Sequence, residues 1–252
     1  MNYKEIFDER GNLYNKAHQI APGARKAEGE AMLKWLQPRA DETIIVTAAG
    51  GGFDACLIAE FLLPACARII CVEPSPLFSS LIPGSFEIIN APLGEIPLPD
   101  GVADAVLNLA ALHHVNERQN TFEEWTRLLR SGGRIVLGDV EEGSSNAAYL
   151  NNTVDQFTPG GHDGKFIKPG ELTEAFSSLP YENPEEALEA YEWIFRDHMT
   201  MVSFSKNLFG MVNGTDEQIA AGIQQYLGVQ DSVADNAMFY PWSLRFFRAT
   251  KR

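Results

Sequence analysis

Three histidines stand where they could take part in acid–base chemistry. His113 and His114 directly follow an apolar run, and His162 lies in a loop with glycines on both sides. An imidazole that titrates near neutral pH can serve as a general base. Each histidine also has an ordinary structural explanation, as a packed, capping or exposed turn residue. The sequence therefore indicates His113, His114 and His162 as catalytic candidates and leaves the choice among them open.

A glycine-rich turn lies upstream of these histidines. Gly50, Gly51 and Gly52 follow the apolar run 43–46 and precede residues 54–62, whose apolar side chains recur at helical spacing. Glycine permits a tight turn and lets a ligand approach the backbone. Glu73 follows the next apolar run, about 20 residues later, where doubly wound folds hydrogen-bond a ribose. We therefore expect a ribose contact at Glu73, although a carboxylate favoured by a helix N-terminus is the alternative.

The elements that position these residues alternate between strand and helix. We expect strands at 43–46, 68–72, 86–90, 105–109 and 134–140, with helices at 54–62 and 118–129. Such alternation predicts a parallel sheet with helices on both faces, and ligands bind at the carboxyl ends of its strands. The glycine turn, Glu73, residues 90–93 and 108–114, and Asp139 should then share one rim.

The flanking regions follow other patterns. Residues 3–17 have helical spacing that Gly11 interrupts, and a second helix is expected at 28–36. Towards the C-terminus we expect helices within 146–157 and at 169–177, 185–190 and 216–227, with Thr215 as an N-cap, and strands at 191–195 and 242–247. The Met and aromatic residues of 191–209 either line a substrate pocket or pack in the core.

As a set, these motifs resemble the class I S-adenosylmethionine-dependent methyltransferases, and most of all the ubiquinone/menaquinone-biosynthesis type with small-molecule substrates. The resemblance covers residues 40–140 and rests on the glycine turn, the Glu73 strand end, IPLPDG at 96–101, ALHHV at 111–115 and RLLRSGGRIVLGDV at 127–140. It implies an α/β fold: a doubly wound, Rossmann-like, mostly parallel seven-stranded sheet with helices on both faces. An N-terminal helical cover and a C-terminal helical insertion would complete it.

The resemblance also implies S-adenosylmethionine as the cofactor and methyl transfer to an oxygen or nitrogen of a small molecule. Tyr14 and Arg25 are candidates for the methionine end, because arginine can pair with a carboxylate through two hydrogen bonds. Helix packing of Tyr14 and solvation of Arg25 are the alternatives. The cofactor-binding candidates are Tyr14, Arg25, Ala48, Gly50, Gly51, Gly52, Glu73, Pro74, Ala91, Pro92, Leu93, Asn108 and Leu109. No metal ligand is expected.

Three positions depart from the family pattern, and one of them is Ala48, where a glycine or proline is common. Val46 stands where members usually carry an acidic residue before the glycine turn, and Pro92 lies where an aspartate often binds adenine. These departures favour a second interpretation, in which S-adenosylmethionine supports non-methyl chemistry such as aminocarboxypropyl transfer or cyclisation. A third is a non-catalytic protein that retains the fold. The intact glycine turn and Glu73 argue against the third.

Chain length and net charge indicate the domain organisation and the class of substrate. With 252 residues, the chain is expected to form one domain, with a helical cap at 1–40, a cofactor-binding core at 41–140 and a substrate-side region at 141–252. Lys and Arg number 20 against 34 Asp and Glu, for a net charge of −14. Nucleic-acid binding requires a basic face, so we expect a small-molecule substrate and no nucleic acid. A monomer or a homodimer is expected.

The cysteines and the hydropathy indicate the compartment. Cys56, Cys66 and Cys71 are odd in number and lack CxxC spacing, which favours structural thiols in a reducing environment. The chain shows neither an apolar leader nor 18 consecutive apolar residues, so we expect no signal peptide and no membrane span. A cytoplasmic location is therefore expected.

Overall fold

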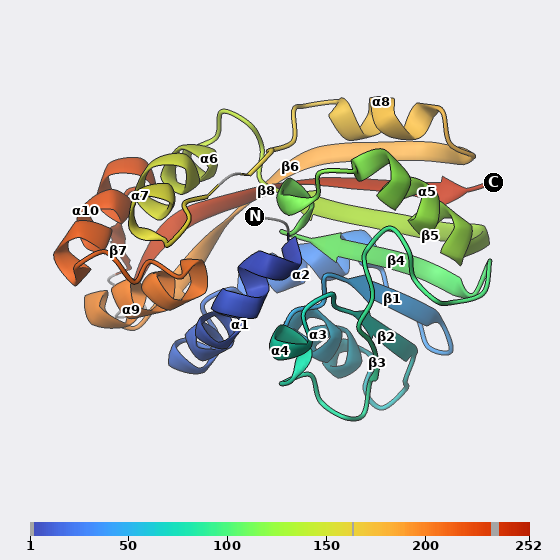
Figure 1. The fold of residues 1–252 in the computed structure, drawn as a ribbon, viewed down its shortest axis with the longest axis horizontal. Helices are drawn as coiled ribbons and strands as arrows, with labels where there is room; N and C mark the ends of the chain where they lie inside the picture. Colours follow the sequence, from blue (N-terminus) through green and yellow to red (C-terminus); the bar gives the residue numbers. More distant parts are fainter. Residues whose placement is uncertain (1–2, 163, 233–236) are drawn as a thin grey trace.

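The computed structural model describes residues 3–162, 164–232 and 237–252 and has a mixed β-sheet at its centre (Figure 1). The strands are β1 (Thr43–Thr47), β2 (Arg68–Val72), β3 (Glu87–Ile89), β4 (Ala103–Leu109), β5 (Leu129–Asp139), β6 (Tyr181–Phe195), β7 (Gln230–Ser232) and β8 (Ala237–Lys251). Their order is β3-β2-β1-β4-β5-β8-β6, and β7 pairs with β8. Strands β1 to β5 pair in parallel, whereas β8 is antiparallel to its neighbours. The predicted doubly wound sheet is confirmed, with β7 as an additional short strand.

Helices cover both faces of this sheet because its central strands are apolar on both sides. On one face α1 (Tyr3–Ile20), α2 (Lys26–Leu36) and α3 (Phe53–Leu62) share a core with side chains such as Val46 and Leu107. On the other face α5 (Arg118–Leu128) and α8 (Glu171–Ser177) pack over Ile45 and Val106. Ile45 and Val46 are adjacent in β1, so this strand contributes side chains to the hydrophobic cores on both faces of the sheet.

A helical group surrounds the extended ends of β6 and β8 (Figure 1). It contains α6 (Ser145–Tyr149), a π-helical turn (Leu150–Val154), α7 (Asp155–Phe157), α9 (His198–Phe209) and α10 (Asp216–Tyr226). The predicted N-cap Thr215 is confirmed: its side chain accepts from the Gln218 N–H, and the Gln218 side chain accepts from the Thr215 N–H. The short elements α4 (Pro76–Ser79) and the 3₁₀ turn Leu112–His114 lie near the predicted rim.

Two expectations about single elements were wrong. Residues 185–190 belong to β6 instead of a helix, and they pair with β8 from Glu185↔Arg248 to Ala190↔Ser243. Their helix-forming side chains are overridden by this pairing. Gly11 does not interrupt α1. A Cβ there would lie 2.9 Å from the Cβ of Phe78, so the glycine lets α1 pack closely on α4.

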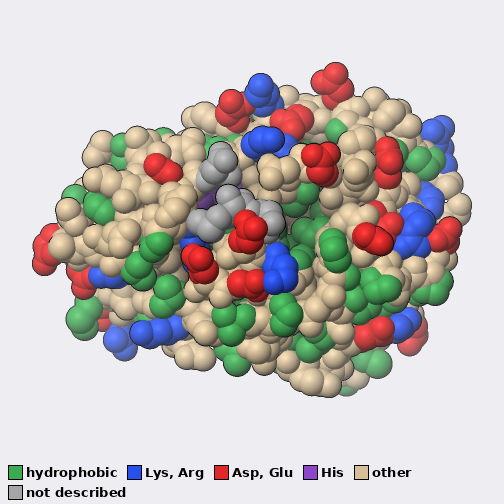
Figure 2. Space-filling model, viewed as in Figure 1, with side chains coloured by type: hydrophobic (Ala, Val, Ile, Leu, Met, Phe, Trp, Pro, Cys, Tyr) green, Lys and Arg blue, Asp and Glu red, His purple; other side chains and the backbone are tan. Residues whose placement is uncertain are grey.

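The surface carries charges of both signs. On the face shown in Figure 2, acidic and basic side chains are interspersed, and a histidine is visible near the centre. Among the described residues, no helix is both long and apolar enough to cross a membrane.

Candidate active site

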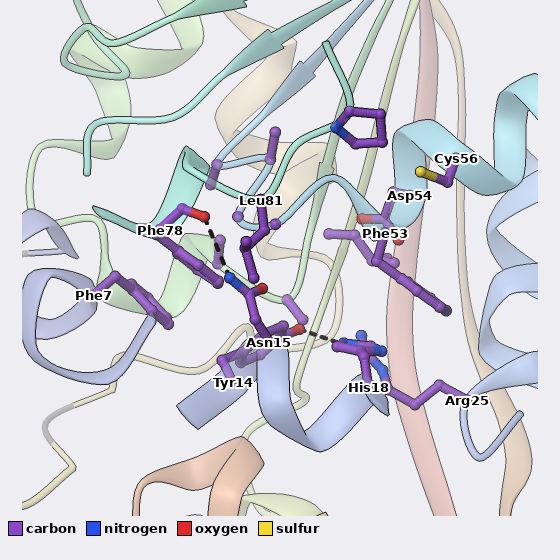
Figure 3. Close-up of a pocket in the computed structure, with 18 of the residues that line it drawn as sticks. Phe7, Tyr14, Asn15, His18, Arg25, Phe53, Asp54, Cys56, Phe78 and Leu81 are labelled. Carbon is purple, nitrogen blue, oxygen red and sulfur yellow. Dashed lines mark hydrogen bonds between the residues drawn. The ribbon is translucent and has the colours of Figure 1, made fainter. Parts of the chain in front are cut away.

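The carboxyl ends of β1 and β4 open onto a cavity of about 270 Å³ (Figure 3). The glycine turn, the end of β4, α1 and the start of α3 form its walls. Six of the predicted cofactor-binding residues line it: Tyr14, Arg25, Ala48, Gly50, Gly51 and Leu109. The other seven are not among its lining residues: Gly52, Glu73, Pro74, Ala91, Pro92, Leu93 and Asn108.

The backbone at this rim turns through unusual conformations. Ala48 and Ala110, after β1 and β4, have φ angles of +52° and +51°, which non-glycine residues rarely adopt. Such angles cluster at functional sites, where the surrounding structure holds them. A Cβ at Gly50 would lie 2.7 Å from the Phe78 ring, and one at Gly51 would lie 2.0 Å from the Asn15 side chain. The glycines here admit α1 and α4 side chains directly above the turn.

Glu73 is fully buried beside the glycine turn. Its Oε2 accepts hydrogen bonds from the Tyr3 hydroxyl at 2.8 Å and the Gly50 N–H at 2.9 Å, and its Oε1 accepts from the Ser75 N–H at 2.9 Å. Burial raises the pKa of Glu73 to about 7, although these hydrogen bonds act to lower it. A phenol from α1 therefore lies where the sequence predicts a ribose hydroxyl.

Asp54, which was not predicted, lines the cavity at the start of α3. Its Oδ1 is buried and has no hydrogen-bond partner among the described residues. Burial raises the pKa of Asp54 to about 6, while the charge of Arg25 opposes this rise. A buried carboxylate oxygen without a partner is costly, so this position suits a cationic ligand group. The sequence did contain a signal for Asp54. This acid lies just after the glycine turn, in a chain that has valine at position 46.

Arg25 is buried at one side of this cavity. It forms an ion pair with Glu28 and donates a hydrogen bond of 2.6 Å to the Tyr14 hydroxyl. Its guanidinium lies 5.4 Å from the ring centroids of both Phe53 and Trp193, within cation–π range. The solvated alternative for Arg25 is wrong, because the side chain is a fixed, buried cation.

A second cavity, of about 70 Å³, adjoins the first. The two cavities share Phe7, Tyr14, Arg25 and Ala110 as lining residues. His113, His114 and His162 line the second cavity, together with apolar side chains from the helical group and the sheet: Leu150, Val154, Trp193, Leu208, Phe209, Trp242 and Leu244. Of the 191–209 segment, Trp193, Leu208 and Phe209 face this cavity, while Met201 and Phe204 are buried in the core.

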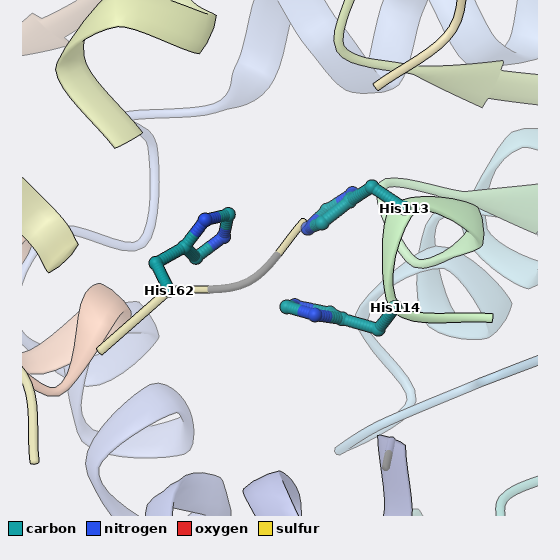
Figure 4. Close-up of side chains that lie close together, drawn as sticks. All are labelled: His113, His114 and His162. Atoms are coloured by element: carbon teal, nitrogen blue, oxygen red, sulfur yellow. The ribbon is translucent and has the colours of Figure 1, made fainter. Parts of the chain in front are cut away.

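The three histidines, predicted from separate parts of the chain, lie together (Figure 4). His113 is held by Asp139, whose Oδ1 lies 2.6 Å from His113 Nδ1 and whose Oδ2 accepts from the His113 N–H at 2.9 Å. Burial acts to raise the pKa of Asp139, but His113 and two backbone N–H groups bring it below its usual value. An ionised carboxylate can only accept, so His113 Nδ1 donates the hydrogen bond to Asp139.

His114 and His162 lie on either side of the same space. Burial and the neighbouring histidines lower the pKa of both side chains, to about 3 for His162. Each has a buried Nδ1 without a hydrogen-bond partner among the described residues. Both rings are therefore neutral at physiological pH and present unpartnered nitrogen atoms.

The central segment of the chain is similar to known methyltransferases. Residues 47–137 match the family model described as a methyltransferase domain. An arsenite methyltransferase of Halobacterium salinarum is 30% identical over 107 residues, which are 39% of this chain and 27% of the relative. The chain spans between 16% and 61% of the lengths of the curated relatives it matches.

Solved structures share the fold over nearly the whole chain. A Thermotoga maritima protein described as a "SAM-dependent methyltransferase, possible histamine N-methyltransferase" superposes with a TM-score of 0.67 at 15% identity, covering 98% of this chain and 99% of its own. The [4+2]-cyclase SpnF superposes with a TM-score of 0.62 at 13% identity, covering 98% of this chain and 94% of its own. At these identities the likeness concerns the fold.

Proposed function

We propose that the chain is a class I S-adenosylmethionine-dependent methyltransferase, on the match of its residues 47–137 to a methyltransferase domain, and that it binds this cofactor in the larger of the two adjoining cavities. The cofactor's methyl group is transferred to a small molecule held in the adjoining cavity. In this arrangement residues 1–40 cap the cofactor, 41–140 bind it, and 141–252 supply the substrate side.

The unpartnered carboxylate of Asp54 is the observation that carries this proposal. The methionine end of the cofactor has an ammonium and a carboxylate group. Asp54 offers the ammonium a buried acceptor, and Arg25, on the same cavity, offers the carboxylate a buried cation. Asp54 then replaces the acid that the family usually carries where this chain has Val46. Val46 itself is 1% exposed within β1, so it does not contact the cofactor.

The nucleoside end lies towards the glycine turn and Glu73, and the sulfonium lies towards Ala110. Ala110 lines both cavities, so a methyl group placed there faces the histidines. Methyl transfer is an in-line displacement at carbon, and the enzyme accelerates it mainly by holding the two reactants at attack distance. The apolar walls of the second cavity exclude water from that contact.

The histidine cluster activates the acceptor in this scheme. A hydroxyl or an ammonium group must lose a proton before or during attack. His113 is the best placed of the three as a base, because Asp139 fixes its tautomer and leaves Nε2 free. The small volume of the second cavity favours either an acceptor group of few atoms or movement of α1.

The alternative is chemistry other than methyl transfer on the same cofactor. Two observations support this alternative. The chain shares its fold with SpnF, which is described as a cyclase, and its acid is at Asp54 instead of position 46. The identity of the cofactor product distinguishes the two functions. S-adenosylhomocysteine marks methyl transfer, methylthioadenosine marks aminocarboxypropyl transfer, and unchanged cofactor with altered substrate marks cyclisation.

Calorimetric titration with S-adenosylmethionine tests the binding step. We expect binding by the wild type, and a 10- to 100-fold weaker affinity for Asp54→Asn, on the order of the loss of one charge-assisted hydrogen bond. Glu60→Gln, an exposed acid on the same helix, is the matched control and should bind normally. Incubation with phenols, catechols and amines, followed by mass analysis, then identifies the product. If the wild type does not bind the cofactor, the proposed function is wrong.

A further inference from the structure

The three histidine rings surround one space, and all three line the second cavity (Figure 4). One nitrogen from each of His113, His114 and His162 lies within 4.8 Å of the other two. The rings come from two separate segments, the 3₁₀ turn after β4 and the loop before α8. His114 and His162 each have a buried Nδ1 without a hydrogen-bond partner among the described residues, and together with His113 they form a ligand set. We propose that this cluster binds a divalent transition-metal ion.

Asp139 supports His113 in the way that metal-binding histidines are usually supported. Metal-ligating histidines almost always donate their second ring N–H to a carboxylate or carbonyl, which fixes the tautomer and raises the basicity of the ligating nitrogen. His113 makes this contact to Asp139 at 2.6 Å. Asp139 is itself held by the N–H groups of His113 and Val140. His113 Nε2 is thus oriented for a ligand before any ligand binds.

The loop that carries His162 is fixed from two sides. The guanidinium of Arg10 donates to the carbonyl oxygens of Pro159 and Gly161 at 2.9 Å each. Asp155 Oδ1 accepts from the His162 N–H at 2.7 Å. The positive charge of Arg10 disfavours a cation nearby, whereas the buried Asp139 compensates for it. The backbone around His162 is therefore placed by contacts that do not use its ring.

The ligand type selects the class of metal. Imidazole suits zinc, copper, nickel and iron, whereas magnesium and calcium prefer oxygen ligands. Nitrogens bound to a tetrahedral zinc at about 2.0–2.1 Å lie about 3.4 Å apart, so the rings need to approach one another by at most about 1.5 Å. Three protein ligands leave a fourth position free, which is typical of catalytic zinc sites.

This inference deepens the proposed function and rests on it for its catalytic meaning. The open position faces the second cavity, where an acceptor oxygen or nitrogen can bind. A bound metal ion would lower the pKa of a hydroxyl that it coordinates, so that the hydroxyl could give its proton to a water molecule. The ion would then take over the role that His113 has in the metal-free protein.

Metal binding is measured on the full chain without cofactor, so that the result does not depend on methyl transfer. Chelator-treated protein is titrated with Co²⁺, followed by visible absorption, and the bound Co²⁺ is then displaced with Zn²⁺. We expect one equivalent to bind with the intense visible bands of a four-coordinate ion. His162→Gln should weaken binding by at least about 10-fold, and Asp139→Asn by about 10- to 100-fold.

His198→Gln is the matched control, because His198 is exposed at the start of α9 and lies outside the cluster. Its Co²⁺ affinity should equal that of the wild type. The buried Asp139→Asn variant is interpreted only if its circular dichroism is native, and His162→Gln, which alters a loop, decides the question in any case. Absence of the visible bands, or equal affinities of wild type and His162→Gln, would overturn the proposal. Cofactor binding in the calorimeter would be unaffected by that outcome.

Discussion

Glu73 couples pH to stability through a single buried carboxyl group. Its pKa of about 7 in the folded protein lies above its ordinary value of 4.5, so the native state retains a proton that the unfolded chain releases between these values. The free energy of unfolding should therefore fall as pH rises from about 4.5 to about 7. The expected loss is about 3 kcal/mol.

Glu73→Gln isolates this contribution, because glutamine has a similar shape and does not titrate. Urea unfolding of both proteins between pH 5 and 8 measures it. The difference between the two should change across this range and be constant above it. A pH-independent difference would mean that Glu73 is ionised throughout.

Among single residues, the sequence predicted those at the carboxyl ends of the strands better than those that line the cavity. Glu73, the glycine turn, His113 and His114 follow from strand ends, because parallel strands bring their carboxyl ends to one edge. His162 was a candidate for another reason, the glycines that flank it. Asp54 was missed because an acid in the first turn of a helix is commonly explained by the helix dipole. Only its buried, unpartnered Oδ1 distinguishes it, and the burial of that atom depends on residues distant in sequence.

The helix α1 covers Glu73, the residue that we propose as the ribose contact. The Tyr3 hydroxyl occupies Glu73 Oε2, and Phe7 stacks on Phe78 of α4 with ring centroids 4.7 Å apart. If a ribose hydroxyl binds Glu73, as we propose, the start of α1 must move away. The same helix lines both cavities, so its movement would also enlarge the acceptor site.

Tyr3→Phe should therefore tighten binding of S-adenosylmethionine, by about 10-fold. The variant keeps the aromatic contact with Phe7 but lacks the hydroxyl that competes for Glu73, a hydrogen bond worth about 1–2 kcal/mol. Tyr226→Phe, on α10, is the control and should bind as the wild type does. Calorimetry at pH 8 measures both. Weaker binding by Tyr3→Phe would show that the phenol contacts the cofactor instead of competing with it.

Element types were predictable where local pattern and tertiary environment agree. The strands of the parallel half and the helices over 118–128 and 216–226 have matching periodicity, and the second helix also has its predicted N-cap. The segment 185–190 failed because glutamate, alanine and leucine favour a helix locally, while pairing along β8 holds it extended. The pairing of β6 with β8 cannot be predicted from the sequence of this segment, because the register of two strands is set by contacts across the fold.

At the scale of the whole molecule, the three sequence segments share one core. Met32 of the N-terminal helices, Val46 of the parallel sheet and Trp193 of β6 belong to the same buried cluster. Strand β8, although last in sequence, lies between β5 and β6 within the sheet. The C-terminal region is thus part of the same hydrophobic interior as the cofactor-binding core, and the chain should unfold as one cooperative unit.

Trp242 is the residue that best tests this cooperativity. It is 4% exposed on β8, and its ring stacks on Trp193 at 4.3 Å between the sheet and α9. Replacement of a buried tryptophan by alanine typically costs about 3–5 kcal/mol. Trp242→Ala should lower the free energy of unfolding by this amount.

In both Trp242→Ala and the wild type, tryptophan fluorescence and far-ultraviolet circular dichroism should give coincident urea transitions, because Trp35 and Trp193 report from the core on one face of the sheet and Trp125 from the core on the other. Leu188→Ala, at an exposed position on β6, should change stability by less than about 0.5 kcal/mol. Two separate transitions, with a partial loss of circular dichroism in the first, would mean that the helical group around β6 and β8 unfolds on its own. The acceptor cavity would then open without loss of the cofactor site, since the residues that line only the second cavity include Leu208 and Phe209 of that group.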